Sequence, residues 1–147
     1  MNQSPEKQRH LLIEEYPPVT MNRSLSKRIL LIDDDRSFRR AVRVYLENYG
    51  FECKEADDGV EALAMLDGGL QVDLVLTDFH MPVIGGMDFL KALGYRMNGR
   101  ATRVILLSGN MTKEMERTAK EHGAFEVLEK PYDHQELLEL VSRACQE

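Results

Sequence analysis

Residues 70–86, LQVDLVLTDFHMPVIGG, constrain the fold of this chain more than any other stretch. The apolar run through Val72 and Leu74–Leu76 is typical of a strand that is covered on both faces. The run ends at Asp78, and Pro82 soon afterwards has no backbone N–H to donate to a sheet. Ligands of open α/β sheets bind at the carboxyl ends of the strands. We therefore expect Asp78 to lie at such an edge and to be the chemical centre of the protein.

Further apolar runs alternate with segments of helical periodicity along the rest of the chain. Strands are predicted at 28–33, 51–56, 103–107 and 125–128. Helices are predicted between them, with Asp35 and Asp133 as N-caps and with Gly50 and Gly123 at helix ends. Alternation of five strands with five helices predicts a parallel sheet with right-handed crossovers and helices on both faces. The polar composition of 51–56 favours a place near the edge of that sheet.

Composition excludes several classes of protein. The 147 residues are enough for one domain with a proper core, and a net charge of −6 argues against non-specific nucleic-acid binding. No apolar run approaches the roughly 18 residues of a membrane helix, and the N-terminus lacks a signal-peptide core. Cys53 and Cys145 match no metal-binding pattern, so we expect reduced thiols and a cytoplasmic location.

The N-terminal segment 1–27 differs from the remainder of the chain. It holds Pro5, Pro17 and Pro18 and shows no sustained periodicity, so we expect a flexible extension followed by a compact domain over 28–147. Two alternatives stay open. Residues 6–16, EKQRHLLIEEY, would form a short helix that docks on a partner or on the domain, or Met21 would be the true start.

Parallel strands bring their carboxyl ends to one edge, and that edge collects reactive side chains from four predicted strands. These are Asp33 and Asp34, Asp78, Ser108 and Lys130. Carboxylates that share a crevice repel one another by about 4 kcal/mol per pair at about 4 Å and an effective dielectric constant of about 20. Mg²⁺ would remove that repulsion, because it prefers oxygen ligands. A carboxylate nucleophile beside cations is suited to form an aspartyl phosphate.

The stretches LLIDDD, LTDFHMP, LLSGN and LEKPY, in this order, resemble the receiver domain of two-component response regulators. The resemblance covers residues 28–147. It implies a flavodoxin-like, three-layer, doubly wound (βα)5 fold whose parallel sheet has the order 2-1-3-4-5, a strand order known from both flavodoxin and receiver proteins. It also implies a regulatory protein that catalyses only its own phosphorylation and dephosphorylation.

The resemblance implies a phosphoacceptor and a metal site. Asp78 would accept the phosphoryl group of a histidine kinase phosphohistidine. Asp34 and Asp78 would bind Mg²⁺ through their side chains, with Mn²⁺ as an alternative ion. His80 would bind the ion through its main-chain carbonyl, and Asp33 mainly through a bound water. The His80 side chain stands where receivers tune dephosphorylation, and a role of this kind stays open.

Further roles implied by the resemblance belong to the strands on the other side of Asp78. Ser108 and Lys130 would contact the phosphoryl oxygens, and the Lys130–Pro131 peptide bond would be cis. Ser108 and position 127 would form the switch region. Position 127 often holds an aromatic residue in this family, so Val127 makes an aromatic switch doubtful. Gly85-Gly86 replaces the usual Asp-Gly, which predicts a more mobile turn.

The implied partners are a sensor histidine kinase or a histidine phosphotransfer protein. An output partner would bind the face formed by the fourth helix, fifth strand and fifth helix, and a homodimer stays open. No direct contact with nucleic acid or membrane is expected. Two competing functions remain: a receiver-fold scaffold that signals without phosphorylation, and, from the enzyme class, a metal-dependent phosphatase or a flavin-binding electron carrier, which the fold alone permits.

Overall fold

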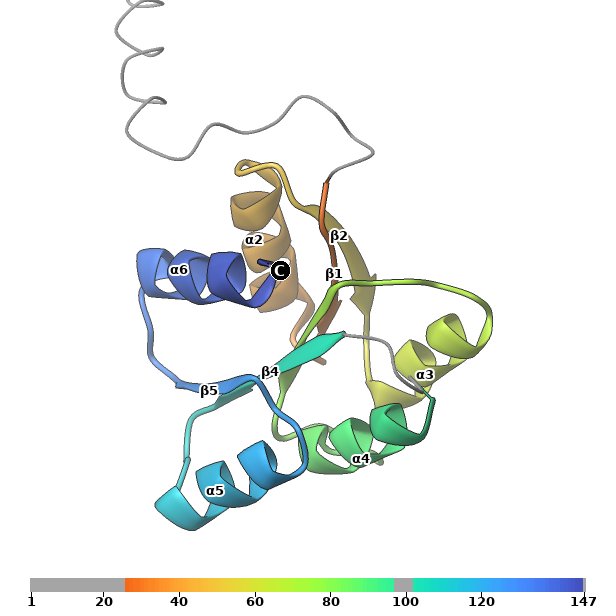
Figure 1. The fold of residues 1–147 in the computed structure, drawn as a ribbon. Coiled ribbons are helices and arrows are strands. Elements are labelled where there is room, and N and C mark those ends of the chain that lie inside the picture. The colour runs from red at the N-terminus through yellow and green to blue at the C-terminus, as the bar shows by residue number, and fades with distance from the viewer. Residues whose placement is uncertain (1–25, 97–101, 147) are drawn as a thin grey trace, which may run out of the picture.

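A computed structural model describes residues 26–96 and 102–146, and within these ranges five strands alternate with five helices (Figure 1). In chain order the elements are β1 (Arg28–Ile32), α2 (Arg36–Glu47), β2 (Glu52–Ala56), α3 (Gly59–Asp67), β3 (Leu74–Asp78), α4 (Gly86–Arg96), β4 (Arg103–Ser108), α5 (Lys113–Glu121), β5 (Glu126–Glu129) and α6 (His134–Ala144). The predicted extension lies almost wholly outside the described residues.

All five strands are parallel and lie in the order β2-β1-β3-β4-β5, which confirms the predicted doubly wound sheet. β2 is an edge strand, as its polar sequence indicates. The central strands β1, β3 and β4 are almost completely buried, because helices cover both of their faces.

The helices form two layers around the sheet. Figure 1 shows α2 and α6 on one face and α3, α4 and α5 on the other. Alternate strand residues therefore face different layers: Ile29 and Leu31 pack with α2 and α6, whereas Leu30 and Ile32 pack with the opposite helices. The sheet is thus the middle layer of three, and its carboxyl edge is the part that the helices leave available for chemistry.

Helix boundaries follow from capping side chains. Asp35, Asp58, Thr112 and Asp133 each accept a hydrogen bond from a backbone N–H in the first turn of the helix that follows. Such caps stabilise a helix by about 1 kcal/mol each. Asp35 and Asp133 were predicted in this role from the sequence. The cap at Asp35 also fixes the direction in which α2 leaves the end of β1, next to the predicted site.

One detail of the interior differs from the sequence pattern, whereas the cysteines are free, as expected. Ala41, on the predicted apolar stripe of α2, is exposed, whereas Arg39 on the same helix is buried. Cys53 and Cys145 are both free and buried, and burial raises the pKa of each thiol to about 12.

No helix within residues 26–96 and 102–146 combines the length and apolar character needed to cross a bilayer.

Candidate functional site

The strand register brings three carboxylates together at the carboxyl edge of the sheet. Ile32, the last residue of β1, pairs with Thr77 of β3, so the residues that follow them, Asp33 and Asp78, are neighbours across the two strands. Oxygens of Asp33, Asp34 and Asp78 all lie within 4.8 Å of one another. Three predicted site residues from two separate segments of the chain thus form one acidic cluster, which we call the acid triad.

Asp33 is the most buried member of the acid triad, with 5% of its surface exposed. Its Oδ1 accepts a hydrogen bond of 2.9 Å from the backbone N–H of Asp35, whereas its buried Oδ2 has no partner. Burial raises the pKa of Asp33; the hydrogen bond from Asp35 lowers it, the charge of Asp78 raises it, and the net shift is upward. A cation beside Oδ2 would offset this cost.

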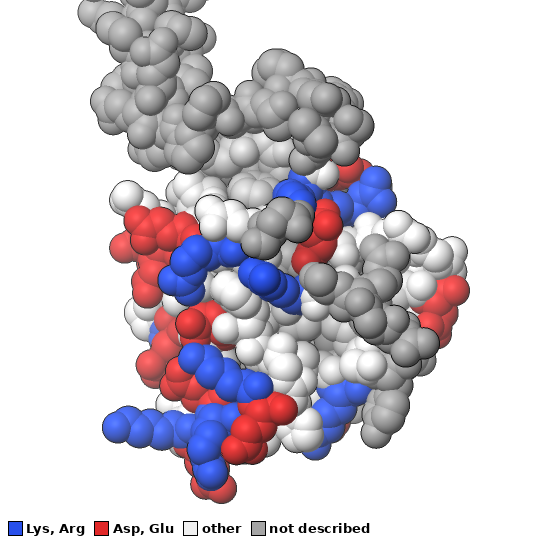
Figure 2. Space-filling view, viewed as in Figure 1, with Lys and Arg blue, Asp and Glu red and all other residues white. Residues whose placement is uncertain are grey.

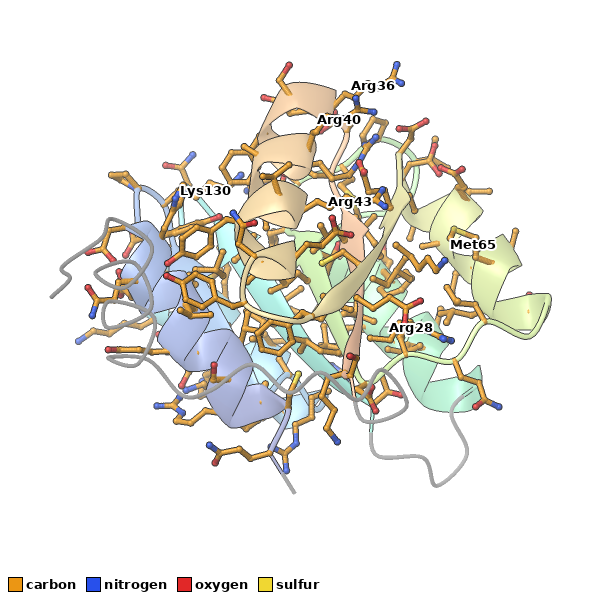
Figure 3. All side chains as sticks on the ribbon, turned by 90° about the horizontal axis from the view of Figure 1, so that it is seen from above. Arg28, Arg36, Arg40, Arg43, Met65 and Lys130 are labelled. Carbon is orange, nitrogen blue, oxygen red and sulfur yellow. The ribbon has the colours of Figure 1, made fainter. Side chains whose placement is uncertain are left out.

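Lys130 supplies the positive charge of the site. Its Nζ lies 3.1 Å from Oδ1 of Asp78, and the two side chains are only 30% and 13% exposed. The same ammonium group stands 4.8 Å from the centroid of the Phe38 ring on α2. Figure 3 shows Lys130 near the start of α6, on the same upper side of the view as Arg36. Held from two sides, the amine has a fixed position next to the Asp78 carboxylate.

The other predicted site residues surround this centre at different depths. Ser108 ends β4 and is fully buried, and its Oγ accepts a hydrogen bond of 3.2 Å from the backbone N–H of Asn110. His80 is exposed, and its ring packs edge-on against Phe79. Val127 on β5 is partly buried against the core, and the Lys130–Pro131 peptide bond is cis. The hydroxyl of Ser108 is therefore engaged locally, outside the acid triad.

The turn after Asp78 depends on a close backbone approach. A Cβ atom on Gly86 would lie 2.7 Å from the carbonyl oxygen of Asp78, so only glycine fits there. The positive φ angle of this turn belongs to Val83, at 68°, and not to either glycine of the Gly85-Gly86 pair. Val83 is also 89% exposed. The turn thus combines a tightly packed glycine with a strained, exposed valine beside the site.

Sequence reasoning missed two aromatic residues at this edge. Phe38 was predicted only as part of a helical stripe, and Tyr132 was given no role. Their rings pack edge-to-face at 6.3 Å between centroids. The buried hydroxyl of Tyr132 has no partner, and burial raises its pKa, with smaller contributions from the charges of Asp33 and Asp78. The position of Tyr132 at the end of the LEKPY stretch, two residues after Lys130, was the one available signal.

The donor set suits a small, hard divalent cation. Three carboxylates converge within 4.8 Å, and a buried oxygen of Asp33 lacks a partner. Mg²⁺ is commonly held by one or two carboxylates together with waters and phosphate oxygens. Because one member of the acid triad is exposed and the others are not, such an ion would keep one side open to solvent. The arrangement can therefore hold an ion and still admit a phosphate-bearing ligand.

Comparison with known proteins gives a consistent result. The model of the family "response regulator receiver domain" matches residues 29–142. The transcriptional regulatory protein CpxR of Escherichia coli (strain K12) is 38% identical over 111 residues, which are 76% of this chain but 46% of CpxR. The chemotaxis protein CheY of Pseudomonas aeruginosa is 31% identical over 117 residues, which are 79% of this chain and 94% of that protein.

Solved structures agree with the fold. The chemotaxis protein CheY4 of Vibrio cholerae superposes with a TM-score of 0.75 and 31% identity, and the match covers 81% of this chain and 98% of that one. The chain spans less than half the length of the CpxR relatives that it matches, at 46%, and nearly all of the chemotaxis proteins. The shared part is therefore the domain that carries the acid triad.

Proposed function

The chain belongs to the response regulator receiver family of two-component signal transduction, and on that premise we propose that Asp78 is its phosphoacceptor. Proteins of this family are regulatory, and their general role is to accept a phosphoryl group. The observation that carries the proposal for Asp78 is its place in the acid triad with the Lys130 amine 3.1 Å from its carboxylate.

The reaction is a transfer from a phosphohistidine. A carboxylate oxygen of Asp78 attacks the phosphorus atom, the bond from phosphorus to the imidazole nitrogen breaks, and that nitrogen leaves with the electron pair. Lys130 stabilises the charge on the phosphoryl oxygens, and Ser108 donates a hydrogen bond to one of them once its hydroxyl turns toward the site. Attack by water on the same phosphorus atom later releases phosphate and restores Asp78.

The acid triad is the proposed Mg²⁺ site, with Mn²⁺ as an alternative. Asp34 and Asp78 would bind the ion with their carboxylates, His80 with its main-chain carbonyl, and Asp33 through a water. When bound, the ion supplies positive charge to the phosphoryl oxygens. Support comes from the buried, partnerless Oδ2 of Asp33 and from the repulsion between the three carboxylates.

Phosphorylation would shift a two-state equilibrium that is read at a distance from Asp78. Ser108 and Val127 are the proposed switch residues, and the output surface is the face of α5, β5 and α6. Acidic and basic side chains alternate over this region in Figure 2. It includes a groove of about 260 Å³ lined by Glu126, Val127, Leu128, Glu136, Glu139, Leu140 and Arg143.

The proposed upstream partner is a sensor histidine kinase or a histidine phosphotransfer protein in the cytoplasm. The proposed downstream partner is another protein or a second copy of this chain. The charged face favours a protein partner because ion pairs such as Lys120–Glu126, at 2.8 Å, can exchange for pairs across an interface. We also propose that the receiver domain spans residues 28–147, which leaves residues 1–27 as a separate N-terminal segment.

Phosphorylation by a small-molecule donor tests the proposal. Incubation with acetyl phosphate or phosphoramidate and Mg²⁺ should add the mass of one phosphoryl group to the intact protein, and excess EDTA should prevent it. Asp78→Asn should abolish the adduct. Asp88→Asn, which removes a carboxylate in the first turn of α4, should leave it unchanged. An unmodified wild-type protein under these conditions would contradict the proposal and favour a scaffold that signals without phosphorylation.

A further inference from the structure

Arg39 is a buried cation that the reaction described above does not use. It is 6% exposed, whereas Arg36 and Arg40 on the same helix are exposed. Figure 3 shows Arg43 on the side of α2 that faces β2. Arg39, one helical turn earlier, contacts the same β2 residue as Arg43, Glu55. Burial of a charge costs several kilocalories per mole unless partners surround it. The contacts that offset this desolvation cost therefore indicate the role of Arg39.

The guanidinium of Arg39 joins three separate segments of the chain. Its Nε donates to Oε1 of Glu55 on β2 at 2.6 Å, and its Nη1 donates to the main-chain oxygen of Asp33 at 2.5 Å. The same Nη1 lies 2.9 Å from Oδ1 of Asp57, which is in the loop between β2 and α3. One rigid fork thus connects the end of β1, the strand beside it and the loop that follows that strand.

The hydrogen bond from Arg39 to the main-chain oxygen of Asp33 is the contact that links Arg39 to the acid triad. Asp33 is also held by its N–H, which donates to the main-chain oxygen of Ala56 at 3.4 Å, and by Oδ1, which accepts from Asp35. With the main-chain oxygen bound to Arg39, the peptide after Asp33 has one orientation. That peptide links Asp33 to Asp34, so its orientation sets the backbone positions from which the two carboxylates of the acid triad project.

The contribution of Arg39 is geometric more than electrostatic. Desolvation lowers the pKa of Arg39, but the hydrogen bond to Glu55 and the charge of Asp57 outweigh it and raise the pKa above its usual value. Arg39 is therefore always positively charged, but the nearby carboxylates of Glu55 and Asp57 largely compensate that charge. What remains for the acid triad is the direction of the hydrogen bond to Asp33, which a lysine with its single nitrogen cannot reproduce together with the other two contacts.

We propose that Arg39 is a positioning residue for the divalent-ion site: it orients the Asp33–Asp34 segment for ion binding through the main-chain oxygen of Asp33. This inference rests on the proposed binding of Mg²⁺ at the acid triad. It also assigns a role to Glu55 and Asp57, which hold the guanidinium through Nε and Nη1 while Nη1 donates to Asp33. The ion site then depends on the β2–α3 loop, although that loop supplies no ligand.

Calorimetric titration of the unphosphorylated full chain with Mg²⁺ tests the inference. Partners that orient metal ligands typically change metal affinity by about 10- to 100-fold, so Arg39→Gln and Arg39→Lys should each raise the Mg²⁺ dissociation constant by about that factor. Arg43→Gln is the matched control: Arg43 binds the other oxygen of Glu55 at 2.8 Å, one helical turn further from the acid triad. It should change the constant by less than about threefold.

A second measurement needs no variant and so does not depend on folding of the mutants. In nitrogen-15 spectra of the wild-type protein, addition of Mg²⁺ should move the Arg39 side-chain N–H signal and leave that of Arg43 in place. The inference is overturned if folded Arg39 variants bind Mg²⁺ as wild type does, or if the Arg39 signal stays still while the Asp78 amide signal moves. A wild-type protein that binds no Mg²⁺ would instead contradict the proposed function.

Discussion

Replacement of Asp33 by asparagine should stabilise the metal-free protein. The carboxylate is 5% exposed, and its oxygens lie within 4.8 Å of those of Asp34 and Asp78. Two unit charges at 4.8 Å repel by about 3.5 kcal/mol at an effective dielectric constant of about 20. Asparagine has the same shape, and its Oδ1 can still accept the hydrogen bond from Asp35. The substitution therefore removes charge repulsion with little change in packing.

The expected gain is smaller than the full repulsion. Asp34 is exposed, so solvent screens its contribution, and the ammonium group of Lys130 attracts the same carboxylates. Protonation sets an upper limit, because a carboxyl with an unfolded-state pKa of about 3.9 can be kept neutral at pH 7 for about 4 kcal/mol. We expect Asp33→Asn to raise the free energy of unfolding by about 1–3 kcal/mol in the absence of metal.

Urea unfolding at pH 7 in EDTA measures this gain. Asp35→Asn is the matched control, because it removes a neighbouring negative charge from outside the acid triad and keeps a good N-cap residue. Its free energy of unfolding should stay within about 0.5 kcal/mol of wild type. Saturating Mg²⁺ should stabilise wild type more than Asp33→Asn, because the variant lacks one charge that favours the ion.

The pH dependence of stability independently tests whether the ionised Asp33 destabilises the metal-free protein. Burial raises the folded-state pKa of Asp33, with the Asp35 hydrogen bond opposing and the Asp78 charge assisting the shift. Protonated Asp33 thus favours folding: its contribution is fully present below the unfolded-state pKa and is lost as the pH rises through the folded-state pKa. The advantage of Asp33→Asn should grow over that window. A variant less stable than wild type in EDTA at pH 7, or an advantage independent of pH, would refute the reasoning.

Three further substitutions test other parts of the structure by urea unfolding. Burial raises the pKa of Glu55, but hydrogen bonds from its two arginine partners outweigh burial and lower it. The ionised Glu55 therefore stabilises the fold above its unfolded-state pKa, and this stabilisation is lost as the pH falls through the lowered folded-state pKa. Glu55→Gln should cost about 3 kcal/mol at pH 7 and flatten the acid limb; parallel pH curves would contradict this. Gly86→Ala should cost about 1–3 kcal/mol because its Cβ would meet the Asp78 carbonyl, whereas Gly94→Ala, with open space around it, should be neutral or stabilising. Val83→Asn should gain about 1 kcal/mol by relief of the positive φ, and a loss would show that the exposed valine is not strained.

The layers and the acid triad could be predicted because each depends on a strong local signal, whereas the strand order came only from the resemblance to receiver domains. Buried parallel strands need continuous apolar runs, and such runs marked the three central strands at 28–33, 72–78 and 103–107. Parallel pairing then brings the residues that follow these strands to one edge of the sheet, independently of how the helices pack. The contact of Lys130 with Asp78 follows from the same rule, because β5 ends beside β4 at that edge.

The features that could not be predicted depend on contacts between segments. Four arginines lie in α2, and composition alone does not say that Arg39 is the buried one; its partners on and beyond β2 decide that. Its spacing from Val42 and Leu46 was a usable signal, because all three lie on one helical face. The Gly85-Gly86 pair predicted a mobile turn through backbone freedom, but the glycine that matters, Gly86, is required by a close approach.

The site of phosphorylation itself is the most direct test of the central claim. The wild-type protein would be treated with acetyl phosphate and Mg²⁺ and then reduced with borohydride, which converts an aspartyl phosphate to homoserine. Peptide fragmentation would locate the converted residue. The account predicts conversion at Asp78 alone, and none when EDTA is present. Conversion at Asp33 or Asp34 instead, or a protein that keeps every aspartate, would contradict it.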